Sequence, residues 1–292
     1  MKTHPDTLLG RLALAARPSR PWLHVHASSW WRRVLLAAGA QEAPLSGKLL
    51  TGATLARADL ARADLTGADL TGADLVRATL FCADLTGATL IGATLFRATL
   101  IGATLFRADL TRADLTRADL TDANLFRADL TDATLTDATL FRATLARADL
   151  TSADLIGATL TGTNLAGATL YRADLTDADL AGADLTDATL ARADLTDADL
   201  TDADLAGADL TDAKLTDATL ARANLTDADL ARANLTDATL VEVVWSEGTR
   251  WPNEQHTSLM RARSDPLGGG QWRVRSAGNS GVDMEVPPVP VS

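Results

Sequence analysis

Leucine recurs at every fifth position from Leu55 to Leu240 without an insertion, which makes 38 consecutive five-residue units between residues 51 and 240. Alanine stands two positions before the leucine in each of these units except one, where Thr163 takes its place. The residue between alanine and leucine is Asp, Thr or Asn in every unit except at Lys214. Most of the chain is therefore a single repeat of the form Ala-polar-Leu followed by two variable residues.

A period of five fits neither a regular helix nor a long flat strand. Five residues advance an α-helix by about 500°, so successive leucines would spiral around all of its faces. On a flat strand an odd period would send alternate leucines to opposite sides. The pattern instead predicts a short extended segment in each unit, with alanine and leucine inward and the polar residue outward. The two variable residues then form a corner.

Glycine and proline support the predicted corners. All eleven glycines within residues 51–240 fall two positions after a leucine, where a corner needs an unusual backbone conformation. The same stretch contains no proline, as expected if every unit joins a continuous hydrogen-bonded ladder. We therefore predict an all-β rod made of stacked coils.

Units such as Ala58-Asp59-Leu60-Ala61-Arg62 and Ala123-Asn124-Leu125-Phe126-Arg127 resemble the pentapeptide-repeat family. The resemblance implies a right-handed quadrilateral β-helix with four units, and hence 20 residues, in each coil. Residues 51–240 would then form about nine to ten coils. With paired strands about 4.8 Å apart, the rod would be about 45 Å long.

The sequence divides into three parts. Residues 1–44 are predicted to be short helices or disordered chain, and they would be placed to cap the N-terminal end of the rod. The β-helix is predicted over residues 45–252, with a C-terminal cap at 241–252. In this cap Val243 takes an alanine position and Trp245 a leucine position, and Trp251 and Pro252 are similar to the ending common in the family. Residues 253–292, which include a run of three glycines and several prolines, predict a disordered tail.

The residue types within the repeat argue against catalysis. Residues 51–240 contain no His or Glu and only one Lys, one Tyr and one Cys, whereas acid–base or nucleophilic catalysis needs a base held against a nucleophile. The aspartates are predicted to lie on an outward, solvated surface. His24 and His26 are too few for a metal site. We expect no enzyme activity, no cofactor and no metal.

Net charge and hydropathy bear on partners and location. The formal net charge of −11 disfavours direct binding to nucleic acid or to an anionic membrane. No apolar run approaches the ~18–20 residues needed to span a bilayer. Arg11 interrupts the apolar stretch near the N-terminus, which does not fit a secretory signal. We expect a soluble, cytoplasmic protein.

With 20 residues in each coil, outward residues fall into columns along the rod. Residues 171–240 hold 16 Asp against five basic residues, so charge is segregated along the axis. One corner column changes from arginine to aspartate toward the C-terminus, and the adjoining face adds three more aspartates, at positions 154, 174 and 194. We name this corner the Arg–Asp column: Arg57, Arg77, Arg97, Arg117, Asp137, Gly157, Asp177, Asp197, Asp217 and Asp237.

Two candidate binding surfaces follow from the columns. Aromatic rings one coil apart can stack simply as part of the structure, but aromatic residues together with arginine are also typical of interface centres. The candidate acidic face comprises Asp154, Asp174, Asp177, Asp194, Asp197, Asp217 and Asp237, and the candidate aromatic and basic face comprises Arg57, Arg77, Phe96, Arg97, Phe106, Arg117 and Phe126.

Three functions remain open. The first is a non-catalytic structural or protein-interaction rod that presents charged columns to an unidentified partner protein. The second is DNA mimicry, because the resemblance extends to the quinolone-resistance members of the family, acidic rods that bind DNA gyrase. This chain differs from them in lacking Phe at the inward central position and in confining its acidity to one half. The third is binding to a crystal surface such as ice through threonine columns that include Thr176, Thr196, Thr216 and Thr236.

The opposite charges at the two ends of the Arg–Asp column also predict self-association. Two rods lying side by side and antiparallel would place the arginines of one copy against the aspartates of the other. The sequence therefore predicts a homodimer as one form of the protein.

Overall fold

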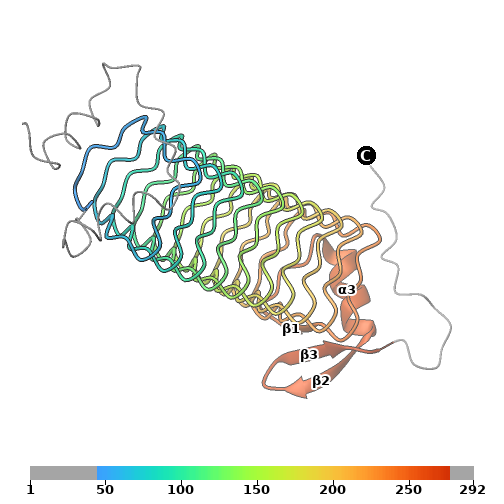
Figure 1. Cartoon of the computed structure of the whole chain (residues 1–292). Coiled ribbons are helices and arrows are strands. Elements are labelled where there is room, and N and C mark those ends of the chain that lie inside the picture. Colours follow the sequence, from blue (N-terminus) through green and yellow to red (C-terminus); the bar gives the residue numbers. More distant parts are fainter. Residues whose placement is uncertain (1–44, 277–292) are drawn as a thin grey trace, which may run out of the picture.

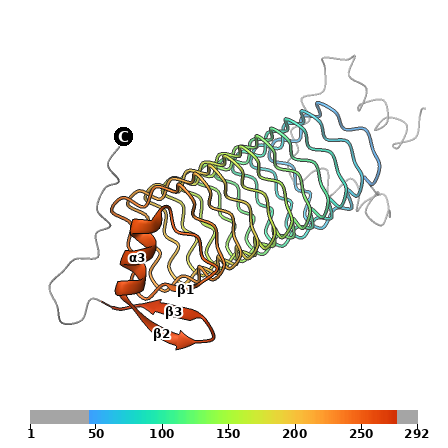
Figure 2. The ribbon, with the colours of Figure 1, turned by 180° about the vertical axis from the view of Figure 1, so that it is seen from behind.

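The computed structural model describes residues 45–276, and their repeat forms a rod of stacked coils (Figures 1 and 2). The outward polar residue of each unit up to Asn224 forms a parallel β-bridge with the residue 20 positions later, as Asp114 does with Thr134. Because 20 residues are four units, each coil has four sides. The chain is therefore a β-helix with the predicted number of residues in each coil. The predictions for residues 1–44 lie outside the described residues.

Backbone hydrogen bonds join each coil to the next and close each corner. The N–H of Leu110 donates to the carbonyl of Asp129 in the following coil, at 2.7 Å. The N–H of Ala113 donates to the carbonyl of Leu110, at 2.9 Å, and this bond closes a four-residue turn. Both bonds recur along the repeat. The backbone N–H groups of the inward alanines and leucines are therefore hydrogen-bonded within the rod.

The interior consists of alternating alanine and leucine layers, as predicted. The alanines and leucines of these inward columns between Leu65 and Leu240 are at most 3% exposed. Thr163, which replaces one alanine, is also fully buried, and its hydroxyl donates to the carbonyl of Leu140 at 2.8 Å. The leucines of the first coil are only partly buried, and the outward Leu49 is 72% exposed.

The corners use a left-handed backbone conformation whether or not the residue is glycine. In one column Gly92, Arg112 and Asp132 have φ values of +60°, +56° and +56°. A positive φ at the third residue of a four-residue turn is the signature of a type II turn. The predicted corners are therefore present, and arginine and aspartate adopt them as regularly as glycine does.

The chain beyond the repeat folds against the last coil. Strand β1 (Val244–Ser246) is followed by helix α3 (Glu254–Ala262) and by strands β2 (Ser264–Gly268) and β3 (Gln271–Val274). The three strands form an antiparallel sheet in the order β1-β3-β2. Figures 1 and 2 show α3 lying across the C-terminal end of the rod, with β2 and β3 beside it. No helix within residues 45–276 is long and apolar enough to cross a membrane.

The prediction of a disordered tail from residue 253 is therefore wrong for residues 253–276. The side chain of Asn253 accepts a hydrogen bond from the backbone of His256 at the start of α3. Met260 and Val274 are buried beneath the last coil. The three consecutive glycines, 268–270, have φ values of +91°, +62° and +80°; Gly268 ends β2, and Gly269 and Gly270 form the two-residue hairpin connection to β3. We name residues 241–276 the extended cap.

An aromatic cluster fills the extended cap. The ring of Trp245 stacks on that of Trp272 and meets that of Trp251 edge-on, with centroid distances of 5.8 Å in both cases. Its indole nitrogen donates to the hydroxyl of Ser264 at 2.9 Å. Val243 and Trp245 occupy the inward positions that the sequence pattern assigned to them, and Pro252 is half-buried. Larger side chains thus close the narrow alanine–leucine core.

Candidate interaction surface

The aspartates between the inward alanine and leucine hold the corners. The coil-to-coil ladder and the turn bond leave out one N–H in each unit, that of the residue after the leucine. Where the polar residue is Asp, its carboxylate generally accepts this N–H, as Asp109 does from Thr111 and Asp129 from Thr131, at 3.0 and 2.9 Å. These carboxylates are mostly half-buried rather than fully solvated. The sequence pattern alone did not reveal this role.

Three residues of the candidate acidic face belong to this class. Asp154, Asp174 and Asp194 each accept the backbone N–H two residues on, at 3.1, 3.1 and 3.2 Å. Asp194 also accepts from Nζ of Lys214 at 2.8 Å. Burial raises the pKa of Asp194, but hydrogen bonds from Lys214 and Thr196 outweigh it, so the pKa lies below its usual value. The charges on this face are partly compensated.

The other four acidic candidates are different. Asp177, Asp197, Asp217 and Asp237 lie at exposed corners, one coil apart, with positive φ values. Within residues 45–276 no ion pair or side-chain hydrogen bond engages their carboxylates. Four negative charges therefore stand in a row at about 4.8 Å intervals with no partner among the described residues.

Opposite charges on two other corner columns pair between coils. Arg142 donates to Asp122 and Arg222 to Asp202, each across one coil, with nitrogen–oxygen distances of 2.7 and 2.6 Å. The hydrogen bonds from these arginines lower the pKa values of both aspartates. These two pairs lie on one column, and on the second column Asp212 accepts from Arg232 in the same way. The Arg–Asp column differs from both because its basic and acidic residues are separated along the rod.

The candidate aromatic and basic face is not a single surface. Arg57, Arg77, Arg97 and Arg117 lie on the Arg–Asp column, and Phe96 lies directly beside it. Phe106 and Phe126 lie on the opposite corner, because ten residues correspond to two of the four sides of a coil. The sequence pattern had grouped residues from both corners, and the structure separates them.

The aromatic rings on the surface pack against neighbours in their own chain. Phe106 and Phe126 stack with a centroid distance of 5.9 Å and an interplanar angle of 3°. The guanidinium groups of Arg107 and Arg127 lie over these two rings, at 5.0 and 5.2 Å from the centroids. This geometry fits the interpretation that aromatic rings one coil apart stack as part of the structure of the rod.

Threonine hydroxyls on the acidic face are also engaged. Thr176 and Thr196 donate to Asp174 and Asp194, at 2.7 and 2.6 Å. Thr236 donates to the neighbouring Asn234 at 2.7 Å. Because these hydroxyls are turned toward their own chain, the column offers no open threonine array of the kind that crystal-surface binding needs.

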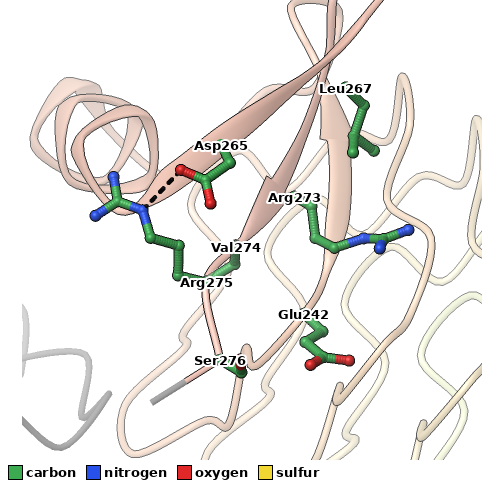
Figure 3. A pocket seen from close by; sticks show the side chains of 7 residues that line it. All are labelled: Glu242, Asp265, Leu267, Arg273, Val274, Arg275 and Ser276. Carbon is green, nitrogen blue, oxygen red and sulfur yellow. Dashed lines mark hydrogen bonds and ion pairs between the residues drawn. The ribbon is translucent and has the colours of Figure 1, made fainter. Parts of the chain in front are cut away.

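A hollow of about 360 Å³ lies within the extended cap, between Glu242 and the β2–β3 hairpin (Figure 3). An ion pair between Arg275 and Asp265, with a nitrogen–oxygen distance of 3.0 Å, borders it. The residues that line the hollow are Glu242, Asp265, Leu267, Arg273, Val274, Arg275 and Ser276.

No group of three or more His, Cys, Asp or Glu residues within residues 45–276 is arranged to hold a metal ion.

Comparison with known proteins gives one family match. The family model described as pentapeptide repeats matches residues 45–80, 80–122, 103–142, 135–177, 178–217 and 213–243. No curated protein matches the chain significantly.

Solved structures include similar coils. HetL, a pentapeptide repeat protein involved in heterocyst differentiation regulation from the cyanobacterium Nostoc, is 36% identical over 74% of this chain and 96% of its own, with a TM-score of 0.45. A pentapeptide repeat protein from the Arabidopsis thaliana thylakoid lumen is 29% identical over 42% of this chain and 83% of its own, with a TM-score of 0.34. QnrB1, a plasmid-mediated fluoroquinolone resistance protein, is 21% identical over 60% of this chain and 95% of its own, with a TM-score of 0.28.

Proposed function

The chain belongs to the pentapeptide-repeat family, and we propose that it is a non-catalytic rod that binds a partner protein through the Arg–Asp column. The observation that carries this proposal is the row Asp177, Asp197, Asp217 and Asp237, whose carboxylates have no partner within the described chain. Such a row is costly for the isolated rod, because like charges repel. A protein surface with basic residues at matching intervals would compensate it.

The β-helix holds these carboxylates in register. Each corner is fixed by a turn hydrogen bond and by bonds to the adjoining coils, such as that from the N–H of Asp177 to the carbonyl of Thr196. A pre-organised row loses little backbone entropy on binding. Complementary charge mainly raises the association rate and the selectivity for the partner. The proposed partner therefore has a basic surface, and its binding weakens as salt increases.

A set of substitutions that remove negative charge tests this function. Replacement of all four corner aspartates by Asn removes the charge, and asparagine readily adopts positive φ. The control variant carries Asn at Asp109, Asp129, Asp149 and Asp209, where it still accepts the corner N–H, as Asn124 does from Phe126 at 3.0 Å.

The measurement is affinity capture of partner proteins on immobilised full-length protein, followed by their identification. The corner variant should lose partners that the wild type and the control variant both retain. Equal retention by all three proteins, or equal loss in both variants, would contradict a role for the Arg–Asp column.

A second candidate function is DNA mimicry toward DNA gyrase. The unpartnered aspartate row favours it, since a line of carboxylates can take the place of a phosphate row. The row covers only the C-terminal coils, and leucine fills the inward central position along the whole repeat. A gyrase supercoiling assay with micromolar purified protein tests this candidate. Inhibition or protection that disappears in the corner variant would support it, and no effect of the wild type would remove it.

A further inference from the structure

The Arg–Asp column is complementary in charge to a second copy of itself that runs in the opposite direction. Its basic half ends at Arg117 and its fully acidic half begins at Asp177, so the midpoint lies between Asp137 and Gly157. When a second copy of the column is turned end for end about this midpoint, every arginine meets an aspartate, and Asp137 meets a glycine. The register sets Arg57 opposite Asp237, Arg77 opposite Asp217, Arg97 opposite Asp197, and Arg117 opposite Asp177.

We propose that two copies of this chain associate side by side and antiparallel along the Arg–Asp column. A two-fold axis perpendicular to both rods passes through the midpoint, so each pairing of Arg77 in one copy with Asp217 in the other occurs twice. The proposal deepens the proposed function, because it names a second copy of the chain as one partner of the column.

The side chains on this column are available for such a contact. The carboxylate of Asp217 has no partner within residues 45–276, and no ion pair in the same part of the chain engages Arg57, Arg77 or Arg97. Arg97 lies over the ring of Phe96, with 5.2 Å between its guanidinium carbon and the ring centroid. That position leaves the edge of the guanidinium free to donate outward.

Other columns are less suited to this contact. One of them also separates basic from acidic residues, but it offers only two aspartates, and Asp227 already accepts from Oγ of Ser246 at 2.7 Å. From residue 107 onward this corner column consists of Arg107, Arg127, Arg147, Gly167, Asp187, Gly207 and Asp227. On the other two corner columns opposite charges already pair one coil apart within the chain, as Asp122 does with Arg142 and Asp212 with Arg232. A partner rod would have to compete with these internal pairs. On the Arg–Asp column the separation of basic from acidic residues leaves most charges for a partner.

The geometry of stacked coils fixes the register. The column from Arg57 to Asp237 spans nine coil steps, or roughly 43 Å at about 4.8 Å for each step. Both copies have the same step, so one matched pair brings the others into register. Asp114 of one copy would face Asp174 of the other, but both carboxylates accept a backbone N–H and are set back from the corner.

The proposed contact is narrow and consists of charged side chains, so the stability of the dimer depends on salt concentration. Corner-to-corner packing buries little apolar surface, so the attraction depends on exposed ion pairs. The screening length falls from about 10 Å at 0.1 M salt to about 3 Å at 1 M. The dimer should therefore form at low ionic strength and dissociate as salt increases.

A charge-swap experiment on the full chain tests the proposal. One variant carries Arg77→Glu and Arg97→Glu, and the other carries Asp197→Arg and Asp217→Arg. Each variant alone sets like charges opposite each other, whereas a mixture of the two restores opposite charges at all four positions. Both substituted residue types occur at such corners with positive φ, as Glu242 and Arg112 show. The control variant, Arg112→Glu with Arg147→Glu, makes the same change on two other columns.

Sedimentation velocity at 20 mM and 500 mM salt provides the readout. We expect wild type and control to dimerise at low salt and dissociate at high salt, each swap variant to be monomeric, and their mixture to dimerise. A wild-type monomer at low salt, a dimer unaffected by either swap variant, or a mixture that stays monomeric overturns the proposal. None of these results removes the proposed function, whose own test is the capture experiment with the corner variant.

Cysteine cross-linking tests the register. In a Cys82→Ser background, Arg77→Cys with Asp217→Cys should give a disulfide-linked dimer at low salt, because these positions lie seven coils apart in one chain and meet only between copies. Arg77→Cys with Asp177→Cys should not cross-link. Equal cross-linking of both combinations overturns the proposed register.

Discussion

Arg117 and Asp137 form an ion pair across one coil, with a distance of 3.1 Å between Nε of the arginine and Oδ2 of the aspartate. Their side chains are 52% and 48% exposed, so the pair contributes at most about 1 kcal/mol to stability. Its importance lies in its position, since it joins the arginine half of the Arg–Asp column to the aspartate half. The two halves are thus opposite in charge; the arginine half is continuous, and the aspartate half is interrupted only by Gly157.

The corner aspartyl hydrogen bonds lead to the first prediction. Asp129→Ala should lower the free energy of unfolding by about 1 kcal/mol, because the N–H of Thr131 loses its acceptor. Asp129→Asn should be close to neutral, since an amide oxygen can accept the same N–H. Chemical denaturation of the two variants and the wild type provides the measurement. Equal losses in both variants would mean that charge, rather than the hydrogen bond, matters at this position.

A corner glycine provides the second prediction. Gly92 has a φ of +60°, and an added Cβ would meet no atom within 4 Å, so only the backbone conformation opposes substitution. Gly92→Asn should therefore change stability little, whereas Gly92→Val should cost about 1–2 kcal/mol. Thermal unfolding of both variants distinguishes backbone strain from crowding. A stable valine variant would show that this corner relaxes away from its left-handed conformation.

The alanine layer leads to the third prediction. Ala133 is only 1% exposed, and the coils above and below it cannot move apart without breaking the ladder. Ala133→Leu should therefore destabilise the rod by about 1–3 kcal/mol through overpacking. Ala146→Leu, at an outward corner position, is the matched control and should have little effect. Denaturation midpoints compare the two, and a neutral Ala133→Leu would show that the core has unfilled space.

The sequence was sufficient to predict a coil because its period of five fits neither regular element, whereas the four sides of each coil came from the family resemblance and not from the period. Leucine at every fifth position excludes the regular helix and the flat strand, and the burial of Leu65 and Ala68 agrees with the remaining solution. The pattern did not reveal that the N–H of Thr111 donates a hydrogen bond to the carboxylate of Asp109. The carboxylate has this role because the coil-to-coil ladder leaves the N–H of Thr111 unpaired. Which N–H is left unpaired can be seen only in the three-dimensional structure of the coil.

The extended cap shows where composition misleads. The glycine run 268–270 reads as a linker by composition, yet it makes the tight connection between β2 and β3. The buried side chains that fix this region, Met260 and Val274, are too few and too far apart to produce a periodic signal. Their contribution depends on contact with the last coil, which is a tertiary effect.

The extended cap also gives the last prediction, which concerns pH. His256 is buried at the start of α3, with its Nδ1 2.9 Å from Oδ1 of Asn253. Burial lowers the pKa of His256 below its usual value of 6.5, because it disfavours the charged imidazolium. The unfolded chain therefore binds a proton at a higher pH than the folded chain does. The stabilising effect of the neutral side chain is complete above about pH 6.5 and is lost as the pH falls toward the lowered pKa.

Acidification from pH 7 to pH 5 should therefore loosen the extended cap before the rod. Amide hydrogen exchange in α3 and β3 should accelerate beyond the intrinsic pH effect, while exchange at buried leucines such as Leu150 remains slow. His256→Gln removes the titrating group, so the extra acceleration should disappear in that variant even if the cap is less stable throughout. If the variant shows the same pH dependence as the wild type, another group must control the opening, because His256 would then contribute no proton linkage.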